Sequence, residues 1–150
     1  MGNAKIGSHV FAAIGGGVIG AIWLSAIWAV IVFPPQIELG GGAVLRGDSI
    51  TLVLHEWGFN ELNRGGPSIE IRAGTEITIT LVNEGRNFHT FQIVQDDGEK
   101  VAGLDEDQVI GSGETLVITF TIYEPGEYFY ICPVSGHRDK GMIGIVTVLP

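Results

Sequence analysis

Residues 126–149, "GEYFYICPVSGHRDKGMIGIVTVL", decide how the C-terminal part of this chain folds. Two runs rich in β-branched and aromatic residues flank a short segment that contains proline and glycine, which predicts two strands joined by a loop. Because side chains alternate between the two faces of a strand, Tyr128, Tyr130 and Cys132 should leave the first strand on one side. The thiol is therefore expected at the end of a strand, where the loop begins.

The loop carries three side chains that bind soft metal ions, Cys132, His137 and Met142, spaced five residues apart. Cys132 is the only cysteine of the chain, which excludes an internal disulfide, a CxxC redox pair and a four-thiolate zinc site. Each residue alone is also compatible with a structural role. Together, thiolate, imidazole and thioether suit copper, and two histidines and one cysteine with a weak axial methionine are typical of blue-copper electron-transfer sites.

Such a site requires one more histidine, and the sequence offers His9, His55 and His89. His9 stands beside a long apolar segment near the other end of the chain. His55 precedes the polar stretch "EWGFNELNRGG" and has no partner at a recognisable spacing, so the sequence indicates no role for it. His89, in "NEGRNFHTFQIV", follows a loop at the start of a predicted strand, and we expect it to complete the site.

From residue 43 onward, apolar and polar residues alternate with a period of two, which is typical of half-buried strands. Turn-forming clusters such as residues 65–67 separate the runs, and no helix longer than one turn is indicated. About seven or eight short strands predict an all-β domain over residues 43–150, an antiparallel β-sandwich with Greek-key connections. The runs are 49–57, 68–83, 88–94, 114–123, 126–132 and 142–149.

The N-terminal part has a different pattern, because residues 10–33 contain no charged residue. A helix of this length is long enough to cross a hydrocarbon core about 30 Å thick, so we predict one transmembrane helix there. The alternative is a cleaved secretory signal, whose apolar core is shorter and ends in small residues. Trp28, Val30 and Phe33 stand where small residues would be needed, which favours an uncleaved anchor.

The residues beside this segment predict the orientation of the chain in a cell membrane. Lys5 precedes the helix, so the positive-inside tendency places residues 1–9 in the cytoplasm and the rest of the chain on the extracytoplasmic side. Pro34 and Pro35 end the helix, and residues 34–42 are expected to form a flexible linker.

Charge is distributed unevenly along the chain. All 17 acidic residues but only seven of the eight basic residues lie beyond residue 36, which gives that segment a formal charge of −10 against −9 for the whole chain. This charge excludes nucleic acid as an expected partner. Two interpretations remain open: a solvated, mutually repulsive surface, or a field that steers a basic partner toward the protein.

Residues 43–150 resemble the cupredoxins, the small blue copper proteins. The resemblance is carried by "NFHTF", "PGEYFYIC" and "CPVSGHRDKGM", and the loop spacing is most similar to that of rusticyanin-, sulfocyanin- and auracyanin-like proteins. It implies a site for one type 1 copper in which His89 is the first histidine, Cys132 the thiolate, His137 the second histidine and Met142 the axial ligand.

The resemblance also implies roles for residues around these four. Thr90, directly after the first histidine, is expected to hydrogen-bond near the sulfur through its hydroxyl or its backbone and to influence the reduction potential. The ring edge of His137 is expected to reach the surface as the main electron port. An apolar docking patch is expected around it, formed by Pro133, Val134, Gly136 and Ile143 together with the axial methionine.

The function implied is that of a membrane-anchored electron carrier rather than an enzyme, with no small-molecule substrate. Its copper would cycle between Cu(I) and Cu(II), and its partners would be redox proteins of a respiratory or photosynthetic chain, such as a cytochrome or a terminal oxidase. One alternative is a blue-copper subunit held permanently in a larger membrane oxidoreductase complex. Another is a copper-binding or delivery module without a redox role, although the chain has only two methionines.

Overall fold

The structure is a computed structural model that describes residues 37–105 and 107–150. The predicted cytoplasmic segment 1–9, the predicted anchor 10–33 and the first residues of the predicted linker lie outside the described residues. Within the two described ranges, no helix has the length and apolar character needed to span a membrane.

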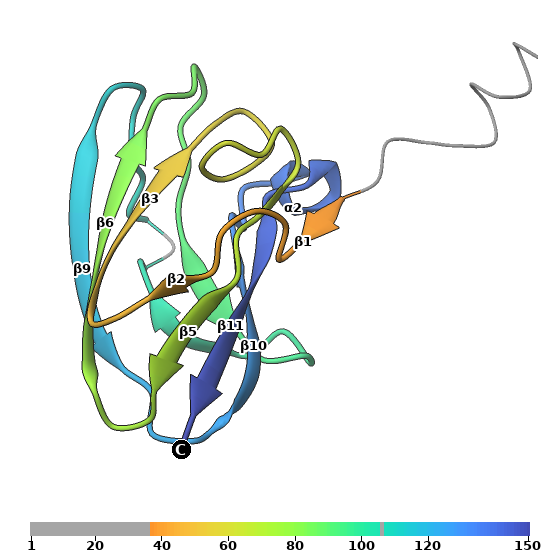
Figure 1. The fold of residues 1–150 in the computed structure, drawn as a ribbon. Coiled ribbons are helices and arrows are strands. Elements are labelled where there is room, and N and C mark those ends of the chain that lie inside the picture. The colour runs from red at the N-terminus through yellow and green to blue at the C-terminus, as the bar shows by residue number, and fades with distance from the viewer. Residues whose placement is uncertain (1–36, 106) are drawn as a thin grey trace, which may run out of the picture. The chain divides into compact units, whose positions relative to one another are not determined.

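Two main sheets pack into a β-sandwich, so the predicted all-β fold is confirmed (Figure 1). One sheet has six strands in the order β2-β5-β11-β10-β7-β8, and the other has three in the order β3-β6-β9. A short third sheet joins β1 and β4. The elements are β1 (Glu38–Leu39), β2 (Leu45–Arg46), β3 (Ser49–Leu54), β4 (Gly65–Gly66), β5 (Ile69–Arg72), β6 (Glu76–Asn83), β7 (Gln92–Val94), β8 (Lys100–Gly103), β9 (Thr115–Thr121), β10 (Gly126–Ile131), α2 (His137–Lys140) and β11 (Ile143–Leu149).

The alternating sequence pattern decides which face of each strand is buried. In β6, "EITITLVN", every second residue is buried, and Ile77, Ile79 and Leu81 enter the core. In β11, Val146 and Val148 do the same from the opposite sheet. Because fully burying one such side chain contributes about 1.5–3 kcal/mol, the two patterned faces favour sandwich packing over separate sheets.

The prediction of an antiparallel sandwich was wrong, because both main sheets contain parallel pairs. β3 runs parallel to β6, while β5 runs parallel to β11 and to β2. After β3 the chain crosses to the other sheet as β5 and returns as β6, and such a crossover lets β6 run in the same direction as β3. A period of two reports which face is buried and carries no information on strand direction.

Several boundaries differ from the predicted ones. Residues 38 and 39, inside the predicted linker, form β1, which pairs in parallel with the two glycines of β4. The run predicted over 49–57 ends at Leu54, because the chain turns where the His55 N–H donates to the carbonyl of Gly58. The run predicted over 88–94 is regular only from Gln92, and β8 (Lys100–Gly103) is an additional strand.

Tyr130 organises the core beneath the loop after β10. It is fully buried, and its hydroxyl donates a hydrogen bond of 2.7 Å to the carbonyl of Pro67. A side chain at Gly66 or Gly144 would collide with this ring, since an added Cβ would lie 2.1 Å from it in either case. Burial raises the pKa of the phenol well above its usual value, so it stays protonated and serves as a donor.

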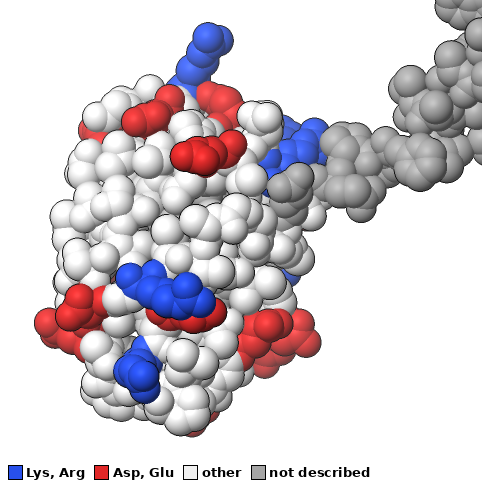
Figure 2. All heavy atoms as spheres, in the orientation of Figure 1, with Lys and Arg blue, Asp and Glu red and all other residues white. Residues whose placement is uncertain are grey.

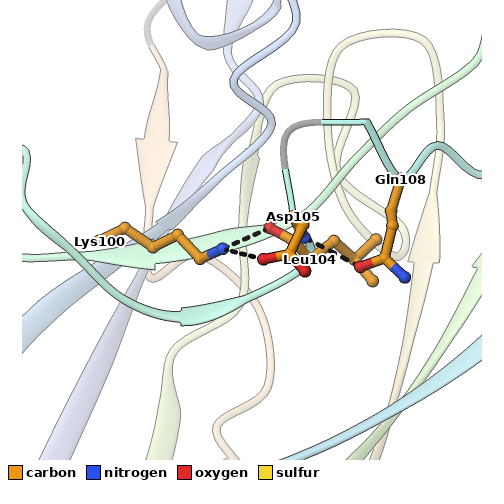
Figure 3. A network of polar contacts seen from close by, with 4 residues as sticks. All are labelled: Lys100, Leu104, Asp105 and Gln108. Carbon is orange, nitrogen blue, oxygen red and sulfur yellow. Dashed lines mark hydrogen bonds and ion pairs between the residues drawn. The ribbon is translucent and has the colours of Figure 1, made fainter.

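The acidic loop after β8 has its own polar anchor (Figure 3). Lys100 Nζ donates to the carbonyl of Leu104 at 2.8 Å and forms an ion pair of 3.1 Å with Asp105. The backbone N–H of Asp105 donates to the side-chain oxygen of Gln108 at 3.0 Å. This network fixes the path that leads to Ile110, and Ile110 pairs with the segment that carries His89.

Candidate metal centre

Three of the four predicted ligands converge at one end of the sandwich. Cys132 Sγ lies 3.5 Å from His137 Nδ1 and 3.8 Å from His89 Nδ1, and the two Nδ1 atoms are 3.3 Å apart. His89 precedes β7, Cys132 follows β10 and His137 begins α2, so three separate elements contribute. These three side chains are buried and lie close enough together to hold one metal ion.

His89 is fixed by its backbone and by a neighbouring asparagine. Its N–H and C=O exchange hydrogen bonds with Ile110, at 3.1 and 2.7 Å. The fully buried Asn83 donates to the carbonyls of Asn87 and Ile110, both at 2.8 Å, and accepts the Gly85 N–H at 2.9 Å. Asn83 therefore connects the loop that precedes His89, at Gly85 and Asn87, to the segment that contains Ile110.

The loop from Cys132 to Met142 closes on itself through backbone bonds. The Cys132 N–H donates to the Met142 carbonyl at 3.1 Å, and the Met142 N–H donates to the His137 carbonyl at 3.0 Å. Gly141 has φ 125°, and an added Cβ would lie 2.8 Å from Arg64 Cβ, so this position excludes other residues. The Met142 side chain is fully buried in the same core cluster as Cys132.

The sulfur receives two backbone hydrogen bonds. The N–H groups of Thr90 and Val134 point to it and lower the pKa of the Cys132 thiol, while burial, the larger effect, raises this pKa. Thr90 thus contacts the sulfur through its backbone. Its buried hydroxyl has no hydrogen-bond partner among the residues that the structure describes.

Both histidines have lowered pKa values, which favours their neutral forms. Burial lowers the pKa of His89 to about 4, with a further contribution from the charge of His137 and an opposing one from Glu56. Burial also lowers the pKa of His137, as does the charge of Lys140, while Glu56 raises it. Neutral imidazoles offer a nitrogen lone pair, which is the form that binds metals.

The chemistry of the donor set fits a soft metal ion. Two neutral ring nitrogens and one thiol face each other, and a single shared proton between them satisfies only part of these lone pairs. A cation among Cys132 Sγ, His89 Nδ1 and His137 Nδ1 satisfies all of them together. The thiolate, two imidazoles and nearby buried thioether suit copper.

The loop between β3 and β4 contributes two residues that the sequence analysis missed. The Trp57 ring meets the His137 ring edge-on, with centroids 5.2 Å apart and planes at 86°. The Glu56 carboxylate accepts hydrogen bonds from the Arg86 N–H and the Asn87 side-chain amide. One dipeptide therefore contacts both histidine-bearing loops, and no motif spacing in the sequence indicated this.

The residues of the predicted docking patch differ in exposure, and His137 itself is 8% exposed. Pro133 and Gly136 are exposed, while Val134 and Ile143 are half-buried. Two exposed apolar residues missed from the sequence, Phe88 (54%) and Val109 (49%), extend this surface. They border a groove of about 360 Å³ together with Thr90, Gln92, Pro133 and Val134.

His55 lies outside the cluster of three donors. It borders a separate groove with Asn60, Glu61 and Glu84, on the side of β3.

Comparison with known proteins gives a consistent result. Residues 61–146 match the family model described as "Cupredoxin-like domain". Rusticyanin from Acidithiobacillus ferrooxidans is 29% identical over 101 residues, covering 60% of this chain and 54% of rusticyanin. L-ascorbate oxidase from Cucurbita maxima is 30% identical over 92 residues, covering 57% of this chain and 16% of the oxidase. The chain thus spans about half the length of the rusticyanin that it matches.

Solved structures share the fold. Reduced auracyanin from Roseiflexus castenholzii superposes with a TM-score of 0.60 at 22% identity, covering 70% of this chain and 99% of auracyanin. A multicopper oxidase, mgLAC, superposes with a TM-score of 0.57 at 22% identity, covering 72% of this chain and 39% of the oxidase. At these identities the likeness concerns the fold alone.

Proposed function

The chain belongs to the cupredoxin-like domain family, and from this premise we propose that it is an electron-transfer protein with one type 1 copper. The observation that carries the proposal is the convergence of Cys132 Sγ with the Nδ1 atoms of His89 and His137 within 3.8 Å of one another. The buried thioether of Met142 supplies the fourth donor type.

When bound, copper supplies one-electron exchange between Cu(I) and Cu(II). The protein contributes a site that is already assembled, because hydrogen bonds fix the backbone on both sides of His89 and close the loop that carries His137. The buried core around Cys132 excludes water, and the Thr90 and Val134 N–H groups stabilise negative charge on its sulfur. Ligands held in this way move little when the charge of the site changes.

We favour a carrier over a stand-alone enzyme, although multicopper oxidases share the fold. Residues 37–105 and 107–150 contain one cluster of histidine and cysteine side chains suited to a metal. His55 is the only histidine of these ranges outside that cluster, which leaves too few ligands for a second copper centre.

The proposed place of action is the extracytoplasmic face of a cell membrane. The uncharged residues 10–33 support a single anchoring helix, and Lys5 supports a cytoplasmic N-terminus. A tethered carrier exchanges electrons with partners within reach of its linker. We therefore propose redox proteins of a respiratory or photosynthetic chain as partners, such as a cytochrome or a terminal oxidase.

Absorption spectroscopy of the full-length protein in a neutral detergent tests the proposal. Copper addition is expected to produce an intense blue thiolate-to-copper band that a reductant bleaches. Cys132→Ser should abolish this band, while His55→Gln, the matched control, should retain it. A wild-type protein that stays colourless, or binds copper equally well without the thiol, would contradict the proposal.

Purification separates the carrier from a fixed complex subunit. A single small protein in mild detergent is the expected result for a carrier. Stoichiometric co-purifying partners would instead assign the chain to a larger oxidoreductase.

A further inference from the structure

Basic residues are enriched in the segments around His137. Beyond residue 36 the chain carries a formal charge of −10, yet three of its seven basic residues, Arg64, Arg138 and Lys140, belong to the segments that surround His137. The only acidic residue of α2 is Asp139. In Figure 2, a patch of Lys and Arg atoms lies near the position of α2, and basic and acidic atoms lie side by side at both ends of the drawn face.

Contacts with Trp57 and Gly141 hold two of these residues near the His137 loop. Lys140 Nζ lies 3.9 Å from the centroid of the Trp57 ring, and that ring packs edge-on against His137. Arg64 packs against Gly141, and the next residue, Gly65, donates its N–H to the Gly141 carbonyl at 2.6 Å. A cation–π contact at this distance favours one position for the ammonium group.

The same cations are available to a partner. Within the described ranges, ion pairs join Arg46 to Glu70 and Lys100 to Asp105, both away from the metal centre. Arg138 and Lys140 are exposed, and neither has a carboxylate partner among the described residues. The sequence left open a basic partner for the acidic domain, but Arg138 and Lys140, on the helical turn that His137 begins, are positively charged.

We propose that Arg64, Arg138 and Lys140 form a cationic face around the His137 edge that docks an anionic surface of the redox partner. This inference rests on the proposed electron-transfer function of the same site. Two carboxylates stand among these cations, Asp139 on α2 and Glu56 directly before Trp57, so the attraction of an anion depends on Arg64, Arg138 and Lys140 outweighing them. Electrostatic steering of this kind changes association rates by about 10- to 1,000-fold and weakens with salt.

Binding of a redox-inert trianion tests the face without any metal. The probe is hexacyanocobaltate(III), added to the metal-free, full-length protein in a neutral detergent and followed by NMR. The amide signals of residues 137–141 and the Trp57 indole N–H should shift on addition. The double variant Arg138→Gln/Lys140→Gln should weaken the apparent affinity by at least about threefold, whereas Arg46→Gln/Arg72→Gln, the matched control, should not. Absent shifts, or equal losses in both double variants, would overturn the proposal.

Electron exchange with small reagents tests the same face in the copper-loaded protein. Ferrocyanide is oxidised to ferricyanide as Cu(II) becomes Cu(I), and hexaammineruthenium(II) gives up one electron in the same way but carries positive charge. The Arg138→Gln/Lys140→Gln variant should react about 3- to 10-fold more slowly with ferrocyanide and no more slowly with the ruthenium complex. Equal changes with both reagents, or none, would overturn the proposal.

The blue absorption band and the trianion experiment distinguish failure of the proposed function from failure of this inference. A protein without a blue band would contradict the proposed function, while the trianion experiment would still test the cationic face.

Discussion

The two histidines of the metal centre are held in contrasting ways. His89 has no exposed surface, its backbone pairs with Ile110, and Asn83 fixes the loop before it. His137 begins a single helical turn, is 8% exposed and contacts the Trp57 ring instead of a strand. The two histidines therefore have different roles. His89 maintains the geometry of the site, and His137 connects the site with the surface.

Removing each histidine in turn should give the largest difference between the two positions. His137→Gly opens a space next to solvent, so millimolar imidazole should enter and restore the blue band of the copper-loaded protein. His89→Gly opens a space inside the core, so the same imidazole should restore little or none of it. The measurement is the blue absorbance against imidazole concentration in both variants. Equal rescue would show that the two positions are equally accessible.

Asn83→Ala should show how strongly the loop before His89 depends on the hydrogen bonds of the Asn83 side chain. The change removes the three hydrogen bonds of this buried side chain, which should lower the free energy of unfolding by about 3 kcal/mol. Denaturant unfolding of the metal-free protein gives the value. Ser112→Ala is the matched control, because it removes one bond to the Gly85 carbonyl and should cost about 1 kcal/mol. Similar losses in the two variants would contradict the role assigned to Asn83.

Acid should destabilise the metal-free protein mainly through His89. Its pKa is about 4 in the folded state against about 6.5 when unfolded, so between these values the unfolded chain binds more protons. Stability therefore falls as the pH drops from about 6.5 to about 4, by roughly 3 kcal/mol for this group. His137 acts in the same direction, since its pKa is also lowered.

Unfolding free energies at pH 7 and pH 4.5 in wild type, His89→Gln and His137→Gln measure this effect. We expect the loss on acidification to shrink more in His89→Gln than in His137→Gln. The reverse order would contradict the contrast in burial between the two rings.

The sequence allowed the ligand types and the buried faces to be predicted, because both depend on local patterns. Cys132, His137 and Met142 lie within eleven residues, and the alternation predicted over residues 68–83 agrees with the buried face of β6. In each case the relevant spacing is set by strand or loop geometry over a few residues. Such signals do not require knowledge of what packs against the element.

What could not be predicted depends on contacts between distant segments. The parallel direction of β3 and β6 follows from a crossover through the other sheet, which leaves no trace in either strand's pattern. β1 pairs with two glycines that offer no side chains to read. Glu56 and Trp57 stand in a polar stretch without a recognisable motif, and only the tertiary structure brings them to Asn87 and His137.

Substitution of Glu56 should have the smallest effect of these changes, and it should act on both histidines because its carboxylate influences both of them. It raises the pKa of His89 and that of His137, so its negative charge lies within electrostatic reach of both. A nearby negative charge favours the more positive oxidation state of a bound metal. Glu56→Gln should therefore raise the reduction potential of the copper-loaded protein, by roughly a few tens of millivolts at the effective dielectric of a protein surface.

The control for Glu56 separates its charge from its hydrogen bonds. Gln at position 56 can still accept the Arg86 N–H through its amide oxygen, whereas Glu56→Ala loses both contacts to the loop before His89. If charge dominates, the two variants should shift the potential alike, and only Glu56→Ala should broaden the blue band or change its position. A reduction potential that changes in Glu56→Ala but not in Glu56→Gln would mean that Glu56 acts by holding the loop before His89. In that case the position of His89 would depend on the β3–β4 loop, as the position of His137 does through Trp57.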